Sequence, residues 1–336
     1  MSLRLLEILV PDAVRDDVTD LLEDVEVIDT WQQPILDERM LVHVLVEAVA
    51  AEDVFDRMET KFAHLAAFRA LIVQVVATIP RPPPPEKEPE PEPEPEAKPE
   101  PKKRSRVARD ELLAALEPGT RITPVFLATV VLSTIVAGIG LLRDNVAVLV
   151  GAMVIAPLLT PNIALALATT LGDLDLGRRA IRTNLVGMAL ALAIAVGVGA
   201  VMTFAPGAEI VARTQPWTGD TLLALASGAA GALAFTSGVS EALVGVMVAV
   251  ALLPPLVVAG ASAGAGRWDH AAGAFVLLAT NVICVNLAAV ITFLVQGVEP
   301  RTWWEADKAK RATRRALLLW GALLVTLILL LALVRL

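Results

Sequence analysis

The sequence predicts an α-helical polytopic membrane protein that carries a small α+β domain at its N-terminus. Its 336 residues are 56% hydrophobic, whereas a soluble globular protein is expected to be roughly 45–50% apolar. Apolar runs long enough to cross a bilayer dominate the chain after residue 124. A tract of alternating Pro and Glu separates these runs from an N-terminal region in which strand and helix patterns alternate. We therefore expect an N-terminal domain at 1–80, a linker at 81–106 and a membrane region from 121 onwards.

The N-terminal region follows the order βαββαβ. Strands are predicted at 3–11, 25–31, 40–48 and 68–79, and helices at 11–25 and 51–65. This order is that of the ferredoxin-like split βαβ unit. The first apolar stretch is interrupted by charges, so it is not a signal peptide, and we expect the domain in the cytoplasm. Such modules often bind a small-molecule effector or pair with copies of themselves, although the fold alone assigns no function.

An extended linker is predicted between the two regions. Residues 81–106 read RPPPPEKEPEPEPEPEAKPEPKKRSR. Proline fixes φ and the like charges repel, so a polyproline II spacer of about 3 Å per residue is expected, with a reach of roughly 80 Å. Residues 107–120 resemble an amphipathic helix that lies in the membrane interface, which makes the lipid bilayer its partner.

Seven spans are predicted in the membrane region. They lie at 124–142, 146–171, 181–205, 221–237, 241–263, 271–296 and 316–334, each close to the roughly 17–25 residues that a bilayer requires. With the N-terminus inside, fifteen Lys and Arg residues lie on inner flanks and four on outer flanks. The positive-inside rule therefore predicts a multi-pass protein of the inner (plasma) membrane whose N-terminus is cytoplasmic.

A thirteen-residue apolar segment occurs twice. The segments LVGAMVIAPLLTP at 149–161 and LVGVMVAVALLPP at 243–255 agree at eight of thirteen positions. Each copy belongs to a three-span unit, 121–205 or 206–298, and a further span lies in 299–336. Because three is odd, the units cross the membrane in opposite senses, as in the inverted repeats of many secondary transporters. The paired small residues are expected to let helices pack closely: Gly151, Gly245, Ser133 and Ser227.

Prolines fall in the second span of each unit. Because proline lacks a backbone donor and clashes with the preceding turn, both helices are expected to kink or unwind near Pro157 and Pro161, and near Pro254 and Pro255. Carbonyl groups freed within lipid cost several kcal/mol each unless another polar group binds them. Candidate groups for a transport path or binding site are the following: Thr160, Asn162, Asn184, Asn281 and Asn286. The alternative is that the prolines are ordinary kinks and the asparagines hold helices together.

A single carboxylate opens the fifth predicted span. Glu241 follows a turn that ends at Ser240. If this turn is sunk in the membrane, the carboxylate is expensive to bury and is a candidate coupling group in the path. If the turn lies at the surface, Glu241 simply benefits from the positive end of the helix.

The sequence contains no constellation typical of catalysis. Phosphate loops, paired-His metal motifs and nucleophile elbows are absent from it, so we expect no enzyme, no catalytic residue, no metal and no cofactor. Most of the acid that gives the net charge of −8 lies in one tract, and nucleic-acid binding is not indicated. The favoured function is a homo-oligomeric transporter or channel for a small polar solute or ion, with a path between the two broken helices and gating by the cytoplasmic domain. The alternative is a membrane-anchored signalling or scaffold protein without transport activity.

The membrane region resembles a known family. Two segments carry the resemblance, STIVAGIGLLRDNVAVLVGAMVIAPLLTP at 133–161 and TSGVSEALVGVMVAVALLPPLVVAGAS at 236–262. They are similar to the prokaryotic membrane proteins grouped as domain of unknown function 389, over roughly residues 120–300. The stretch SEALVG at 240–245, within the second segment, departs from the family pattern. The resemblance therefore assigns no role to the residues of this turn. The resemblance implies membrane location and a common fold, and it implies no substrate.

Overall fold

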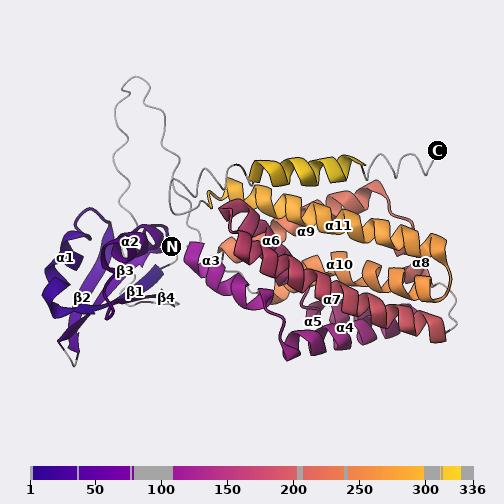
Figure 1. The fold of residues 1–336 in the computed structure, drawn as a ribbon, viewed down its shortest axis with the longest axis horizontal. Helices are drawn as coiled ribbons and strands as arrows, with labels where there is room; N and C mark the ends of the chain where they lie inside the picture. The colour runs from indigo at the N-terminus through magenta and orange to yellow at the C-terminus, as the bar shows by residue number, and fades with distance from the viewer. Residues whose placement is uncertain are drawn as a thin grey trace, which may run out of the picture. The chain divides into compact units, whose positions relative to one another are not determined.

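The computed structural model describes most of the chain, which contains a part with a β-sheet and a part built from helices (Figure 1). The described residues are 3–35, 38–75, 78, 109–202, 207–237, 241–298, 311 and 313–326, without the side chains of 218, 237 and 241–251. The chain divides into two compact units, Met1–Glu111 and Leu112–Leu336. The predicted linker at 81–106 lies outside the described residues.

The N-terminal unit contains a four-stranded antiparallel sheet. Its strands are β1 (Leu3–Pro11), β2 (Val27–Ile35), β3 (Arg39–Glu47) and β4 (Arg69–Val75), in the spatial order β2-β3-β1-β4. Central strand β1 pairs antiparallel with both β3 and β4, so Glu7 lies opposite His43 and Leu71. The helices α1 (Arg15–Asp20) and α2 (Ala48–Phe62) complete the order βαββαβ that the sequence predicts.

One face of this sheet and one stripe of α2 form the core of the N-terminal unit. Leu6, Ile8 and Val10 of β1 are fully buried, because alternate residues of a strand point to the same face. Val54 and Met58 of α2 recur at helical spacing and are equally buried. The first helix is shorter than the predicted 11–25, since it consists of a 3-10 turn (Asp12–Val14) and α1 alone. No basic residue lies in the last turn of α1 to favour a longer helix there.

The membrane unit is built from α-helices. The described helices are α3 (Arg109–Leu116), which continues into the 3-10 turn η2 (Glu117–Thr120), then α4 (Pro124–Leu142), α5 (Val146–Ile155), α6 (Leu159–Leu171), α7 (Leu174–Val201), α8 (Ala208–Thr214), α9 (Thr218–Ser237), α10 (Glu241–Gly264) and α11 (Trp268–Val295), and residues 313–326 are helical as well. Helix α3 and η2 fall in the segment 107–120 for which an interfacial helix is predicted. The short helix α8 is not predicted from the sequence.

The apolar helices are compatible with a multi-pass membrane protein. Within the described residues, four helices are long and apolar enough to span a bilayer: Pro124–Leu142, Leu174–Val201, Gly219–Thr236 and Trp268–Val295. The bent pair of α5 and α6 makes a fifth span if it is counted as one. Of α10, the described apolar part is Leu252–Gly264. The predicted total of seven spans is therefore not reached by the described helices, and the inverted repeat stays a prediction.

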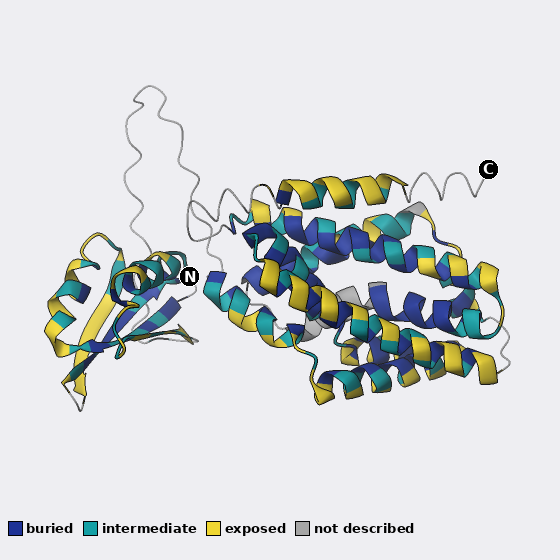
Figure 2. Cartoon of the chain, in the orientation of Figure 1, coloured by how far each residue is buried: buried dark blue, intermediate teal, exposed yellow. Residues whose placement is uncertain are grey.

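Helix α11 is the most buried of the four candidate spans. It packs against α6, α8, α9 and α10, and 67% of its most apolar stretch is buried, compared with 28% for α7. Figure 2 shows the contrast, because α11 is largely dark blue whereas α4 and α7 carry exposed faces. These exposed faces contain large apolar side chains such as Leu132 and Leu185. Surrounding hydrocarbon suits such faces, since lipid tails are as apolar as leucine.

Side-chain caps determine where several helices begin. The Thr123 hydroxyl accepts a hydrogen bond from the Phe126 amide, 3.1 Å away, at the start of α4. The Asp173 carboxylate accepts from the amides of Asp175 and Leu176 at the start of α7. Such caps satisfy backbone donors that have no partner inside the helix. The cap at Asp173 explains why α7 begins seven residues before the predicted span at 181–205.

Candidate functional site

The second predicted span is broken at Pro157. Helix α5 ends at Ile155, α6 begins at Leu159, and their axes differ by 52°. Ala156 has an extended ψ of 120°, as expected for a residue before proline. Pro157 cannot donate to the Met153 carbonyl, but the Ala156 amide lies 3.3 Å from this oxygen and supplies a donor. The predicted interruption is therefore confirmed at this position.

Pro161 is accommodated by the same break. It is the third residue of α6, and the first residues of a helix need no backbone donor. Two prolines four residues apart therefore require only one interruption of the span.

Unwinding at the second pair of prolines is not found, whereas the alternative of a kink there stays a prediction. Helix α10 runs without interruption from Glu241 to Gly264 through Pro254 and Pro255. These prolines remove the donors that would bind the carbonyls of Val250 and Ala251. Burial favours continuity, because the stretch from Leu252 to Gly260 is buried throughout in the bundle. Within the described residues, the pair α5 and α6 is therefore the interrupted span, and it lies beside a continuous α10.

Three buried asparagine amides form a row next to the break. Asn162 in the first turn of α6 donates through Nδ2 to Oδ1 of Asn184 on α7, at 3.1 Å. Asn286 on α11 donates through Nδ2 to Oδ1 of Asn162, also at 3.1 Å. The exposed fractions of Asn162, Asn184 and Asn286 are 2%, 5% and 0%. The row therefore joins three helices that are far apart in the sequence, and all three residues were predicted as polar partners of the break.

The amide nitrogens of Asn162 and Asn286 each donate a second hydrogen bond, and one acceptor of the row is without a partner among the described residues. The Asn162 amide nitrogen also donates to the Leu158 carbonyl at 2.8 Å, beside the break. The Asn286 amide nitrogen also donates to the Val282 carbonyl at 2.9 Å. Oδ1 of Asn286 is buried and has no hydrogen-bond partner among the described residues. Such an acceptor is costly to bury, so it marks a position where a polar species would be stabilised.

The depth of the amide row follows from helix geometry. Asn184 is ten residues beyond the start of α7, which corresponds to about 15 Å at 1.5 Å per residue. Asn286 is nine residues before the end of α11, or about 14 Å by the same rise. The hydrocarbon core of a bilayer is about 30 Å thick. Asn286 therefore lies well inside the spanning part of α11, whereas Asn184 lies near the start of the apolar part of α7, two residues after Arg182.

The turn η2 packs against the start of α6. A Cβ atom at Gly119 would collide with the side chain of Thr160, so only glycine allows this approach. The Thr183 hydroxyl of α7 donates to the Thr120 carbonyl of η2. Thr160 is therefore a packing neighbour of η2. The turn η2 therefore covers the start of α6, directly after the break.

The remaining predicted residues are buried, exposed, or at positions where the structure does not describe the side chain. Asn281 is buried on α11, and Ser133 and Ser227 are buried on α4 and α9. Gly151 is exposed, and a Cβ atom there would have nothing within 4 Å, so its predicted role in helix packing is wrong. Gly245 and Glu241 belong to α10, where their side-chain positions are not described, and Ser240 lies outside the described residues.

Other glycines make the close helix contacts. A Cβ atom at Gly199 of α7 would collide with the backbone of Ala261 of α10, and one at Gly264 would collide with the backbone of Val196. Gly260 lies against Ala195 in the same way. The sequence contains a signal for this contact, because Gly260 and Gly264 form the G-x-x-x-G pattern of packed membrane helices, which the prediction overlooked.

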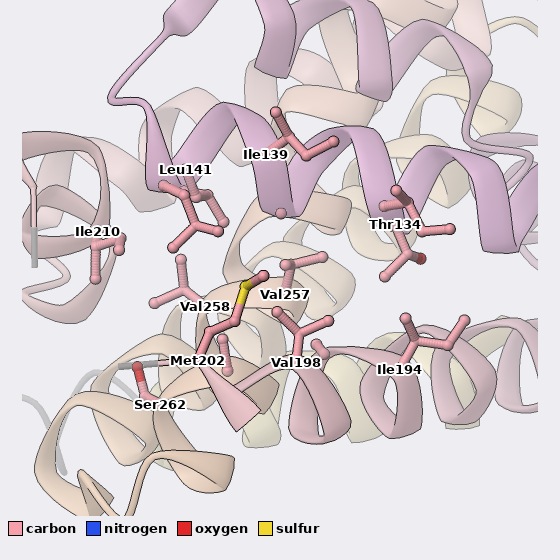
Figure 3. A pocket seen from close by; sticks show the side chains of 15 residues that line it. Thr134, Ile139, Leu141, Ile194, Val198, Met202, Ile210, Val257, Val258 and Ser262 are labelled. Carbon is pink, nitrogen blue, oxygen red and sulfur yellow. The ribbon is translucent and has the colours of Figure 1, made fainter. Parts of the chain in front are cut away.

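A separate cavity of about 260 Å³ lies between α4, α7, α8 and α10. Figure 3 shows side chains from these segments pointing toward one another, among them Leu141 of α4, Val198 of α7, Met202 directly after α7, and Val257 of α10. The lining is almost entirely apolar, and it includes no residue of the amide row. No sequence pattern predicts this cavity, since its walls come from four separate segments.

The described part of the chain contains no cluster of three His, Cys, Asp or Glu residues that could hold a metal ion. No charged residue lies near Asn162 in α6 or near Asn286 in α11, and the charged residue nearest to Asn184 along α7 is Arg182, whose side chain is exposed. The chemistry available near the break is therefore that of neutral amides and hydroxyl groups.

Comparisons with known proteins agree with the predicted resemblance. The model of a family described as domain of unknown function (DUF389) matches residues 153–287. An uncharacterized protein of Methanocaldococcus jannaschii is 35% identical over 223 residues, which cover 66% of this chain and 70% of the relative. No solved structure matches the chain significantly.

Proposed function

Because the chain belongs to the DUF389 family, whose description assigns no activity, we propose from its own geometry that it is a membrane transporter or channel for a small polar solute or ion. The observation that carries this proposal is the row Asn184, Asn162 and Asn286 beside the broken span, with a buried acceptor left free of described partners. The path would run along the row between α6, α7 and α11.

The energetics of burial support a functional reading of the amide row. A buried amide without hydrogen bonds costs several kcal/mol in hydrocarbon. One pair of asparagines would suffice to join two helices, whereas this row brings together three helices at an interruption of the backbone. Irregular backbone at membrane depth is tolerated where it is buried in protein or lines a cavity. In transporters, substrate sites are typically formed by such interrupted helices.

The chemistry of the row limits the solute. Amide groups offer both donors and acceptors but carry no charge. A neutral polar molecule, or an ion that exchanges part of its hydration shell for amide oxygens, would match such a path. The N-terminal unit would sense or gate from the cytoplasm, with a small-molecule effector as its candidate ligand. An inverted repeat, a homo-oligomer and an N-terminus inside the inner membrane belong to the same proposal.

Transport can be tested with the full chain in liposomes. Stopped-flow osmotic swelling would measure entry of glycerol and urea, and fluorescent dyes would report fluxes of protons, potassium and chloride. Flux of at least one of these solutes above that of empty vesicles is expected. Asn162→Leu and Asn286→Leu should lower this flux, whereas Gly197→Leu should not, because Gly197 is exposed on α7 with open space around it. Each variant is first checked for a monodisperse folded peak.

A signalling or scaffold role without transport is the alternative. In that case the membrane unit only assembles cytoplasmic domains, and the amide row only holds α6, α7 and α11 together. Equal flux in protein-containing and empty vesicles for every solute, with Asn variants that merely unfold more easily, would reject the transport proposal.

A further inference from the structure

The apolar cavity lies at one end of the bundle. Its lining residues belong to the last turns of α4, α7 and α10 and to Ile210 of α8. Exposed tryptophans lie at the same end. Trp268 begins α11, where Gly273 lies against the backbone of Thr214 at the end of α8, and Trp217 follows shortly after Thr214. Exposed tryptophan side chains are typical of the level where hydrocarbon meets headgroups. The cavity therefore lies just inside this level.

Water is an unsuitable occupant of this cavity. A buried water molecule needs two to four polar partners. The Thr134 hydroxyl in the wall already donates to the Val130 carbonyl at 2.7 Å, and the rest of the lining is apolar apart from Ser262. An apolar cavity of this kind holds an apolar occupant or stays empty.

The cavity opens toward the surface that faces hydrocarbon. Ile135, Ile139 and Met202 line it and are about half exposed. Its volume of about 260 Å³ is below the roughly 300–1,000 Å³ of sites that enclose a drug-sized molecule. A flexible chain that enters from the side and leaves the rest of its molecule outside fits this size. Lipid acyl chains are the material that surrounds a spanning helix.

A cationic side chain follows directly after the cavity wall. Leu141 and Leu142 line the cavity, and Arg143 is the next residue, exposed at the end of α4. The neighbouring carboxylate of Asp144 is engaged elsewhere, since it accepts from the amides of Ala208 and Glu209 at 3.2 and 2.7 Å. No described carboxylate pairs with Arg143. Guanidinium groups bind phosphate strongly through parallel hydrogen bonds.

We propose that the cavity between α4, α7, α8 and α10 binds one acyl chain of a phospholipid, whose phosphate is held by Arg143. The contacts between α7 and α10 at Gly199 and Gly260 give the site a rigid wall. The proposal rests on insertion of this unit in a membrane and does not depend on transport.

Native mass spectrometry of the detergent-purified full chain tests the site. Dioleoylphosphatidylglycerol and dioleoylglycerol are the two probes, because they share acyl chains and differ in the phosphate. One retained phosphatidylglycerol is expected, with weaker retention of diacylglycerol. Gly138→Phe should fill the cavity, since Gly138 lines it and a Cβ atom there meets nothing within 4 Å. Gly197→Phe is the matched control, because Gly197 is equally open but does not line the cavity.

The expected effects are a loss of retained lipid in Gly138→Phe and wild-type retention in Gly197→Phe. Arg143→Gln should weaken phosphatidylglycerol binding about tenfold, as expected for one charge-assisted contact, and leave diacylglycerol unchanged. If Gly138→Phe does not fold, lipid retention is measured in Gly138→Leu, which fills the cavity with a smaller side chain. Wild-type retention in a folded cavity-filling variant would overturn the acyl-chain site. Equal binding of both probes in the wild type would overturn the phosphate contact.

Discussion

The amide nitrogen of Asn286 donates to Oδ1 of Asn162 at 3.1 Å, and this bond joins the buried core of α11 to the first turn of α6 beside the broken span. The two residues are 124 positions apart in the chain. Their contact fixes the end of the interruption against the most buried of the candidate spans.

A double-mutant cycle on Asn162→Ala and Asn286→Ala is expected to give a coupling free energy of about 0.6 kcal/mol, the average for hydrogen bonds between membrane helices, and at most about 1.7 kcal/mol. Reversible unfolding in mixed micelles measures it. Asn162→Ala combined with Thr326→Ala is the control, because Thr326 is exposed and bonds only within its own helix. This control pair should be additive. A coupling of zero for Asn162 and Asn286 would contradict the bond.

Two glycines of α7 should respond oppositely to the same substitution. Gly199→Ala should lower the free energy of unfolding by about 1–3 kcal/mol, because the added methyl group collides with the backbone of Ala261 on α10. Gly197→Ala should leave stability unchanged or raise it by about 0.5–1 kcal/mol, since alanine favours the helix and the site is open. Thermal unfolding in detergent compares the two proteins. Equal effects would show that α7 and α10 do not approach as described.

The carboxylate of Asp144 caps α8, and its removal should loosen that helix. Asp144 accepts from the amides of Ala208 and Glu209, so Asp144→Ala leaves two backbone donors unsatisfied at a cost of about 1 kcal/mol. Hydrogen–deuterium exchange should become faster in the α8 peptide. Asp144→Asn should retain part of the protection, because asparagine keeps one acceptor and tolerates the positive φ of 50° at this position. Unchanged exchange in Asp144→Ala would exclude the cap.

The break at Pro157 was predictable from the sequence, because a missing donor and a clash with the preceding turn act locally. Pro254 and Pro255, by contrast, do not unwind α10, which is buried and continuous there. Local backbone preference and tertiary packing compete at both pairs of prolines. Only the local backbone preference can be predicted from the sequence. The order of strands and helices in the N-terminal unit depends mainly on local patterns and was therefore predictable.

The members of the amide row were predictable, but their mutual contacts were not. Asparagine is rare enough in apolar helices to be noticed, so Asn162, Asn184 and Asn286 could be selected from the sequence. Which of them meet depends on how α6, α7 and α11 are arranged. The apolar cavity left no pattern, because its residues are ordinary members of four apolar helices. Arg143 likewise resembles any charged residue at a helix end.

Prolines in α10 and α6 should differ in their effect on stability. Pro254→Ala restores a backbone donor for the Val250 carbonyl inside a continuous helix, so it should raise the free energy of unfolding by about 1–3 kcal/mol. Pro161→Ala is the matched control, since the third residue of α6 has no intrahelical acceptor to serve and should change stability by less than about 1 kcal/mol. Thermal unfolding of both variants in the same detergent provides the comparison.

The same variants connect stability with the proposed transport. If the carbonyls freed by Pro254 and Pro255 contribute to the path, Pro254→Ala should become more stable and also conduct less in the liposome assay, as is common where function depends on a strained element. If it becomes more stable with unchanged flux, the α10 prolines are structural kinks and the path is confined to the amide row. A loss of stability in Pro254→Ala would instead show that the proline ring packs as an essential part of the bundle, which contradicts the donor argument.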